Sequence, residues 1–236
     1  MNIKRAFNIS LLFLVTVLVP VVVVLTAVRI VIHPWYLEFE YHTPGFPADP
    51  YGFTLQERLQ YARLAVDYLL NDQGIQFLAD LHFPAGQQAP ENSCQFMEDC
   101  TRLFNDRELE HMLDVKRVVG AAFRVWLAGL ALLVIGGLIA WRMKAWKDYR
   151  LALSRGGWLT IALLGAIIVL AIIAFSTIFV AFHEVFFPPG TWTFYYSDTL
   201  IRLFPQRFWR DTFLMVGGLS VLMGLVLAIP LRPKKL

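Results

Sequence analysis

The sequence has few charged residues and only two cysteines. Lys, Arg, Asp and Glu together make up 17% of the 236 residues, whereas 57% of the residues are hydrophobic. Soluble domains carry about 45–50% apolar residues, so this composition excludes an ordinary soluble domain. The mean hydropathy of +0.55 points the same way. The composition predicts a membrane protein.

Several well-known catalytic and binding motifs are also absent. The sequence has no G-x-S-x-G elbow, no H-E-x-x-H helix and no glycine-rich phosphate loop. His183-Glu184 has Phe187 at the position where a zinc helix carries its second histidine. We therefore predict no metal site, no cofactor and no nucleic-acid partner.

Four apolar runs are long enough to cross a bilayer, which takes about 20 apolar residues. They occupy residues 9–32, 118–141, 158–182 and 212–231. The first run has no A-x-A-like cleavage site, which favours a retained helix over a signal peptide. We expect an all-α membrane protein with four transmembrane helices in a single membrane domain, residues 1–236.

The distribution of Lys and Arg predicts the orientation of these helices, because short cytoplasmic segments are enriched in both. Apart from Arg29 and Arg124, which lie within apolar runs, the cations outside the large connections are Lys4, Arg5, Arg142, Lys144, Lys147, Arg150, Arg155, Arg232, Lys234 and Lys235. The 33–117 connection holds fourteen acidic and six basic residues, and the 183–211 connection holds three of each. We expect both connections to be extracytoplasmic, the 142–157 loop to be cytoplasmic, and both termini to lie inside.

The first outer connection carries helical signals and both cysteines. Thr54 and Glu57 have the spacing of a capping box, which predicts a helix that runs to about Leu70. Cys94 and Cys100 lie on the oxidising side of the membrane, which favours a disulfide. We expect a mainly helical region stapled by this bridge.

A second outer helix carries a histidine toward the second apolar run. It begins with Asn105 as a cap residue and continues without a breaker, so His111 lies roughly two turns outside the apolar core. Glu108 and Asp114 stand three residues before and after His111, where either carboxylate can meet the imidazole. The other interpretation is a solvated face of mixed charge.

The stretch 176–211 places an ionisable pair beside many aromatic residues. His183 and Glu184 end the third apolar run, and Phe186, Phe187 and Trp192 follow. These rings form either the wall of a lipid or acyl-chain site or an ordinary interfacial aromatic belt. Further along, Ser197-Asp198 is expected to cap a short helix at the outer interface.

Two arginines lie inside predicted membrane helices. Arg29 is near the outer end of the first helix, and Arg124 is about two turns inside the second. Each either snorkels to the lipid headgroups or faces the interior, where it would hold a lipid phosphate or an acyl oxygen.

Three segments resemble the motifs of a known family. HMLDVKRV at 111–118, and FHEVFFPPGTWTF and DTLIRLFPQRFW within 182–209, are similar to those of the lipoprotein intramolecular transacylase (Lit) family of bacterial four-helix membrane proteins. The resemblance covers most of the chain and places the two functional histidines of the family at His111 and His183. It implies a multi-pass protein of the bacterial cytoplasmic membrane with an extracytoplasmic active site.

The resemblance also implies a reaction and a substrate. The sn-2 acyl chain of a diacylglyceryl-modified lipoprotein moves to the α-amine of its own N-terminal cysteine, with membrane lipid as surroundings and no cofactor. His183 is expected to act as base and His111 as acid or oxyanion donor, an assignment that is reversible. The expected supporting residues are Glu108, Asp114 and Glu184 as orienting groups, and Lys116, Arg29 and Arg124 as stabilisers of negative charge.

Two other functions are compatible with the pattern. The first is a non-enzymatic membrane module that binds a lipid or a partner and senses pH through its histidines. The second, a transporter, is less favoured because the chain shows no internal repeat and no carboxylate within its apolar runs. The sequence predicts no particular oligomeric state.

Overall fold

The computed structural model describes residues 3–231 of the chain, which divide into two compact units. The described part of unit 1 comprises residues 3–31, 121–174 and 213–231, and unit 2 comprises residues 32–120 and 175–212. The C-terminal cations at positions 232, 234 and 235, which we used to predict the orientation, lie outside the described residues.

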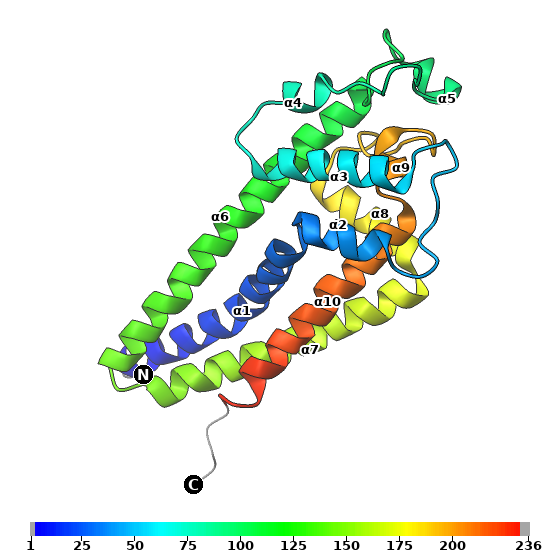
Figure 1. Ribbon diagram of the computed structural model, residues 1–236. Coiled ribbons are helices and arrows are strands. Elements are labelled where there is room, and N and C mark those ends of the chain that lie inside the picture. The colour runs from blue at the N-terminus through cyan, green and yellow to red at the C-terminus, as the bar shows by residue number, and fades with distance from the viewer. Residues whose placement is uncertain (1–2, 232–236) are drawn as a thin grey trace. The chain divides into compact units, whose positions relative to one another are not determined.

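Helices make up all the regular elements of the described chain, apart from an isolated bridge between His82 and Arg102. In chain order they are α1 (Ile3–Val31), α2 (Pro34–Tyr41), α3 (Leu55–Leu70), α4 (Gln76–Ala79), α5 (Glu91–Cys94), α6 (Asp106–Arg142), α7 (Trp146–Ile173), α8 (Phe175–Phe186), α9 (Thr199–Leu203) and α10 (Gln206–Ala228) (Figure 1). The prediction of an all-α protein is confirmed.

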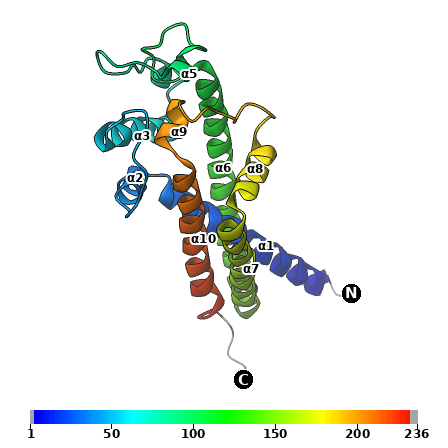
Figure 2. The same cartoon turned by 90° about the vertical axis from the view of Figure 1, so that its right-hand side faces the viewer.

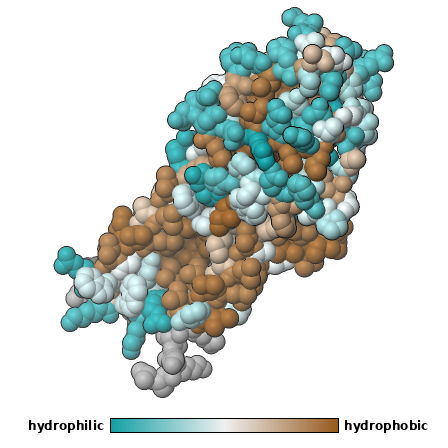
Figure 3. Space-filling model, viewed as in Figure 1, coloured by the Kyte–Doolittle hydropathy of each residue, from teal (hydrophilic) through white to brown (hydrophobic). Residues whose placement is uncertain are grey.

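Four of these helices are long and apolar enough to cross a membrane: α1 from Ile9, α6, α7 and α10. Figure 3 shows apolar residues gathered over the helices of unit 1, as expected for surface that faces lipid. The prediction of four membrane-spanning helices is thus supported by length and composition. The inside location of both termini, the boundaries of the spans and the single domain stay predictions.

The third apolar run, 158–182, does not form one helix. α7 ends at Ile173, and Ala174 leaves the helical conformation with φ −146° and ψ 46° before α8 begins. The break coincides with the boundary between the units, since α7 belongs to unit 1 and α8 to unit 2. The sequence did not predict this break, because no proline or glycine stands at Ala174.

Unit 1 is held together by close helix packing at small residues. Val15 and Val19 of α1 are buried in one cluster with Ala140 of α6 and Tyr149 of α7. A Cβ atom at Gly156 of α7 would lie 2.5 Å from the Cβ of Val19. Small residues at such crossings let membrane helices approach closely, where packing rather than hydrophobic burial holds them.

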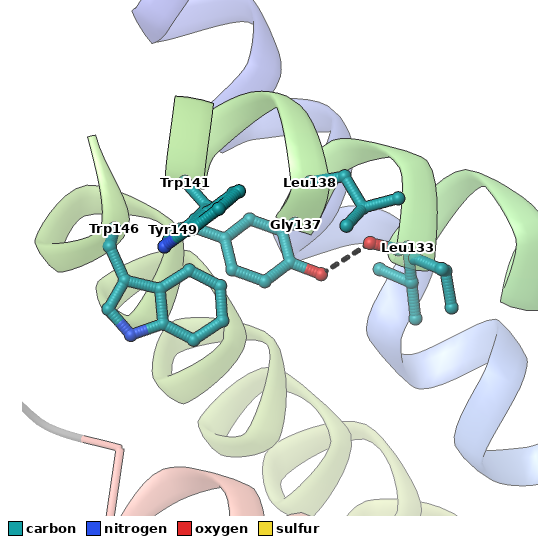
Figure 4. A pocket seen from close by; sticks show the side chains of 7 residues that line it. Leu133, Gly137, Leu138, Trp141, Trp146 and Tyr149 are labelled. Carbon is teal, nitrogen blue, oxygen red and sulfur yellow. Dashed lines mark hydrogen bonds between the residues drawn. The ribbon is translucent and has the colours of Figure 1, made fainter. Parts of the chain in front are cut away.

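Tyr149 of α7 also contacts α6 (Figure 4). Its hydroxyl donates a hydrogen bond of 2.6 Å to the carbonyl oxygen of Leu133, and its ring stacks on Trp146. These residues border an apolar hollow of about 360 Å³, which also has Gly137 and Trp141 in its lining. All of its lining residues belong to unit 1, and it contains no ionisable group of the predicted site.

The connection of residues 33–117 lies in unit 2 and has two local features that the sequence predicted. Thr54 and Glu57 form a capping box at the start of α3, in which Thr54 Oγ1 accepts from the Glu57 amide and Glu57 accepts from the Thr54 amide. Cys94 and Cys100 form the expected disulfide. Leu55 stands in the first turn of α3 and is 43% exposed.

Candidate active site

His183 lies on the buried face of α8 with a defined tautomer. Phe175 and His183 are the buried residues of this helix, and their spacing places them on one face. The His183 Nδ1 atom lies 2.7 Å from the carbonyl oxygen of Phe179, one turn earlier. A carbonyl oxygen only accepts, so Nδ1 carries the proton and the lone pair of the neutral ring is on Nε2.

Burial keeps this imidazole neutral at pH 7. Only 9% of His183 is exposed. Desolvation lowers its pKa below the usual 6.5, and the hydrogen bond with the Phe179 carbonyl opposes that shift. Nε2 of His183 is therefore available as a proton acceptor.

His111 meets His183 in a cluster of aromatic rings. The centroids of the two imidazoles are 6.2 Å apart, and their planes differ by 21°. Phe187 contacts both, at 4.9 Å from His111 and 5.5 Å from His183, and Phe194 lies 5.3 Å from His111. Within the described chain, His111 Nδ1 is buried and has no hydrogen-bond partner. The structure thus brings together the two histidines that sequence analysis paired.

Trp192 completes this cluster on the side of His183. Its ring centroid is 4.9 Å from that of His183, and its indole Nε1 is buried without a hydrogen-bond partner among the described residues. Phe186, by contrast, is largely exposed and contacts Phe182. Of the three aromatic residues expected to line an acyl site, Phe187 and Trp192 contact a histidine.

Glu108 is 1% exposed, yet its hydrogen bonds go to the backbone and not to His111. One carboxylate oxygen accepts from the Asn105 amide at 2.8 Å, while Asn105 Oδ1 accepts from the Glu108 amide, which closes a capping box at the start of α6. The other oxygen accepts from the Leu200 amide in α9 at 2.6 Å. Glu108 therefore ties the N-terminal turns of α6 and α9 together. Figure 2 shows α9 beside the N-terminal part of α6.

Asp198 also differs from its expected role. It precedes α9, but its side chain makes no capping bond there. It accepts instead from the Tyr195 amide at 2.8 Å, from Asn105 Nδ2 at 3.1 Å and from Arg107 at 3.3 Å. Glu108 accepts from the α9 amide instead. Asp198 therefore holds the loop between α8 and α9, residues 187–198, against α6, and we call this segment the aromatic loop.

The other predicted supporting groups have other partners or are exposed. Asp114 pairs with Arg117 at 2.9 Å, and Glu184 is exposed. Lys116 Nζ donates to the carbonyl oxygen of Gln73 at 2.6 Å and lies 4.1 Å from the centre of the Tyr68 ring. Lys116 thus braces the end of α3.

Both predicted membrane arginines belong to unit 1, whereas both histidines belong to unit 2. The Arg29 guanidinium stacks over Phe123 at 4.6 Å from the ring centre, and Arg124 is exposed. A cation over an aromatic face is stabilised by the ring quadrupole, so Arg29 has a local structural role.

The segment of residues 93–100, which contains the disulfide, contacts the aromatic loop. The sequence alone did not predict this contact. Ser93 donates to Ser197 at 2.8 Å in a buried hydrogen bond, and Phe96 stacks on Tyr195 at 5.6 Å. These partners are about a hundred residues apart, and neither pair forms a recognisable motif. These contacts join the segment that contains the Cys94–Cys100 bridge to the loop that carries Trp192.

A second hollow, of about 750 Å³, lies between α2 and α3 and has Glu38, His42 and Arg63 in its lining. It includes neither histidine of the cluster. Across the described residues, no group of three or more His, Cys, Asp or Glu side chains is arranged to hold a metal ion.

The chain is similar to known proteins. The family model described as "Lipoprotein intramolecular transacylase Lit" matches residues 13–209. A protein of Aquifex aeolicus (strain VF5), itself described as uncharacterized, is 31% identical over 205 residues, which cover 84% of this chain and 82% of that protein.

Solved structures share the fold. A histidine-substituted variant of the membrane-integral lipoprotein intramolecular transacylase Lit from Bacillus cereus aligns with a TM-score of 0.71 at 19% identity, covering 97% of this chain and 92% of that one. Another structure of the Bacillus cereus protein gives a TM-score of 0.64 at 19% identity, with 94% and 93% covered. The family model spans most of the chain, and the chain therefore belongs to the lipoprotein intramolecular transacylase (Lit) family, a family of membrane acyltransferases.

Proposed function

We propose that this protein moves the sn-2 acyl chain of a diacylglyceryl-modified lipoprotein to the α-amine of the N-terminal cysteine of the same molecule. The product is an N-acylated lipoprotein that retains one acyl chain on its glyceryl group. Membership of the family supports the reaction class. The juxtaposition of His183 and His111 carries the assignment of the site.

The defined tautomer supports His183 as the base. Aminolysis of an ester requires a neutral amine, but a free α-amine has a pKa of about 7.7–8.0 and is largely protonated at pH 7. Nε2 of His183 is an acceptor because Nδ1 donates to Phe179. His183 takes a proton from the attacking amine as the nitrogen–carbon bond forms.

His111 acts on the carbonyl oxygen. Two imidazolium rings with centroids 6.2 Å apart in an aromatic cluster would repel each other, so the pair holds at most one extra proton. While His183 carries that proton, neutral His111 donates a hydrogen bond to the oxyanion of the tetrahedral intermediate. The intermediate then breaks its bond to the sn-2 glycerol oxygen, which receives the proton from the pair. The net change is one proton moved from the amine to the glycerol oxygen.

The site faces the extracytoplasmic side of the bacterial cytoplasmic membrane in this proposal. Residues 33–117 and 183–211 are extracytoplasmic, residues 142–157 are cytoplasmic, and both termini are inside, in agreement with the bias of Lys and Arg. Both reacting groups sit on one substrate molecule, so no acyl-enzyme intermediate is required. Holding them at attack distance supplies much of the rate.

The test is expression in bacterial cells that cannot N-acylate their lipoproteins. Mass spectrometry of the N-terminal lipopeptide should show the acyl chain on nitrogen and a single acyl chain on glycerol. His183→Ala and His111→Ala should each abolish the conversion at unchanged membrane levels. The exposed His42, which lies in unit 2 but outside the cluster, supplies the matched control His42→Ala.

Two outcomes contradict the proposal in different ways. Unchanged diacylglyceryl peptide, with the wild-type protein present in the membrane, would rule out the reaction. Normal conversion by both cluster variants would leave the reaction in place and remove the histidines from it.

A further inference from the structure

We propose that the indole N–H of Trp192 is a catalytic hydrogen-bond donor, directed at the carbonyl oxygen of the migrating acyl group. This inference rests on the proposed function and adds a residue to it. Trp192 stood in the sequence analysis as a wall of the acyl site. The buried indole nitrogen and its position beside His183 point to a chemical role.

The first observation is a buried donor without a partner. Nε1 of Trp192 is buried, and within the described chain no group accepts a hydrogen bond from it. A buried donor left unpaired costs about 1–3 kcal/mol, and buried tryptophan N–H groups usually find an acceptor. An acceptor on the substrate would remove that cost when it binds.

The second observation is the position of this donor. The Trp192 ring is 4.9 Å from the His183 ring, and His183 is itself paired with His111. The amine that His183 deprotonates attacks the acyl carbon, so this carbon lies close to His183. Its carbonyl oxygen therefore lies in the same cluster as the Trp192 ring. The indole N–H donates and never accepts, so its partner is an acceptor oxygen and not the ammonium form of the amine.

The third observation concerns competing donors. Lys116, a predicted stabiliser of negative charge, is engaged by Gln73 and Asn71 at the end of α3. Arg107, the cation that precedes His111 by one turn, is paired with Asp198. A neutral N–H donor suits an aromatic cluster, because it needs no desolvated counter-charge and still stabilises a developing oxyanion.

The loop that carries Trp192 is fixed before any substrate arrives. Gly190 has φ +84°, a left-handed conformation that favours glycine, and turns the chain. Thr191 Oγ1 donates to the carbonyl oxygen of Pro188 at 2.9 Å, and the Tyr195 amide donates to Asp198 on the other side of Trp192. These contacts restrict the loop on both sides of Trp192, so the indole N–H loses little conformational freedom when an acceptor oxygen reaches it.

The experiment uses the full-length protein in lipid nanodiscs with a synthetic diacylglyceryl-cysteine peptide. Trp192→Phe removes the N–H group and keeps an aromatic body. Replacement of Trp192 by benzothienylalanine exchanges the N–H for sulfur with almost no change in shape, which keeps the test valid if the phenylalanine variant folds poorly. We expect kcat to fall about 100-fold in both variants, the usual loss for one oxyanion donor, with KM changed less than threefold. Trp35→Phe, an exposed tryptophan of α2, is the matched control.

A binding measurement separates a catalytic role from a structural one. The probe is a lipopeptide with a tetrahedral phosphonate in place of the sn-2 acyl carbonyl. Both variants should bind it about 100-fold more weakly than the wild type, and should bind the unreactive diether peptide as the wild type does.

Other results decide against the inference. Variants that convert the peptide within twofold of the wild type, or that raise KM at constant kcat, would make Trp192 a wall and not a donor. Equal loss of affinity for the phosphonate peptide and the diether peptide would also make Trp192 a wall of the site and not a donor. Absence of conversion by the wild type overturns the proposed function together with this inference, whereas normal conversion with unaffected variants overturns this inference alone.

Discussion

His183 donates a hydrogen bond from Nδ1 to the carbonyl oxygen of Phe179 over 2.7 Å, within a single turn of α8. The bond uses the carbonyl oxygen of the residue one turn earlier in α8, whose two lone pairs let it accept from the imidazole as well as from a helix amide. It determines which nitrogen of His183 can act as a base, and no carboxylate is required for that purpose. This explains why Glu184, the neighbour in sequence, is free to point to solvent.

The first prediction concerns the pH dependence of turnover. Burial lowers the pKa of His183 below 6.5, so protonation of this base inactivates the enzyme only below that pH. With a substrate analogue that carries an α-hydroxyl in place of the amine, kcat/KM should fall in acidic buffer with a midpoint below that of a free imidazole. The hydroxyl analogue is the control for ionisation of the substrate amine. An acidic limb with its midpoint above pH 7 would contradict the assignment.

The second prediction concerns Glu108 as a structural tie. Glu108→Ala leaves the amides of Asn105 and Leu200 unpaired in a buried place, at about 1–3 kcal/mol for each group. We expect the variant to lose about 2–4 kcal/mol of unfolding free energy and to melt at a clearly lower temperature in detergent. Glu110→Ala, an exposed glutamate two residues along α6, should stay within about 0.5 kcal/mol of the wild type. Equal melting temperatures for the two variants would remove the structural role of Glu108.

The third prediction concerns Glu40, a carboxyl group of α2 that is 2% exposed. Burial first, and then the nearby carboxylate of Asp211, raise its pKa from 4.5 to about 7, against the attraction of Arg207. The folded protein thus binds more protons than the unfolded chain between pH 4.5 and about 7, and its stability falls as the pH rises through that window.

Replacement of this carboxyl group should therefore abolish part of the pH dependence. Glu40→Gln should melt at a higher temperature than the wild type at pH 8, by an amount that corresponds to about 1–3 kcal/mol, and near the wild-type value at pH 4.5. Glu98→Gln, at an exposed position, should follow the wild type at both pH values. A Glu40→Gln variant less stable than the wild type at pH 8 would reverse the sign and contradict the prediction.

The fourth prediction concerns the close approach of α7 and α10 in unit 1. A Cβ atom at Gly157 would lie 2.6 Å from the carbonyl oxygen of Gly224 and 2.8 Å from the amide of Ala228, both of which are backbone atoms that move only with their helix. Gly157→Ala should destabilise the protein by about 1–3 kcal/mol, as overpacking does. Gly165→Ala, on the same helix with open space at its Cβ, is the matched control and should be neutral or slightly stabilising. Comparable melting temperatures for both variants would contradict this packing.

Several local patterns in the sequence predicted the local structure correctly. The capping box of Thr54 and Glu57, the cap at Asn105 and the disulfide of Cys94 and Cys100 depend on residues close together in the chain, so their geometry follows from spacing. The length and apolarity of the runs similarly predicted the helices that are long enough to cross a membrane. Spacing failed where a side chain had a distant competitor, as with Glu108, which bonds to Leu200 and not to His111.

The sequence by itself determined the helical class and the membrane character, because both are expressed in residue type and period, and its motifs pointed to the two histidines that the structure brings together. Tertiary structure alone decided the break of the third run at Ala174, the use of the Phe179 carbonyl and the position of Trp192. The physical reason is that every residue has a backbone carbonyl and every tryptophan has an indole N–H, so their presence in the sequence carries no information about their partners. Only packing determines which of them is buried beside an imidazole.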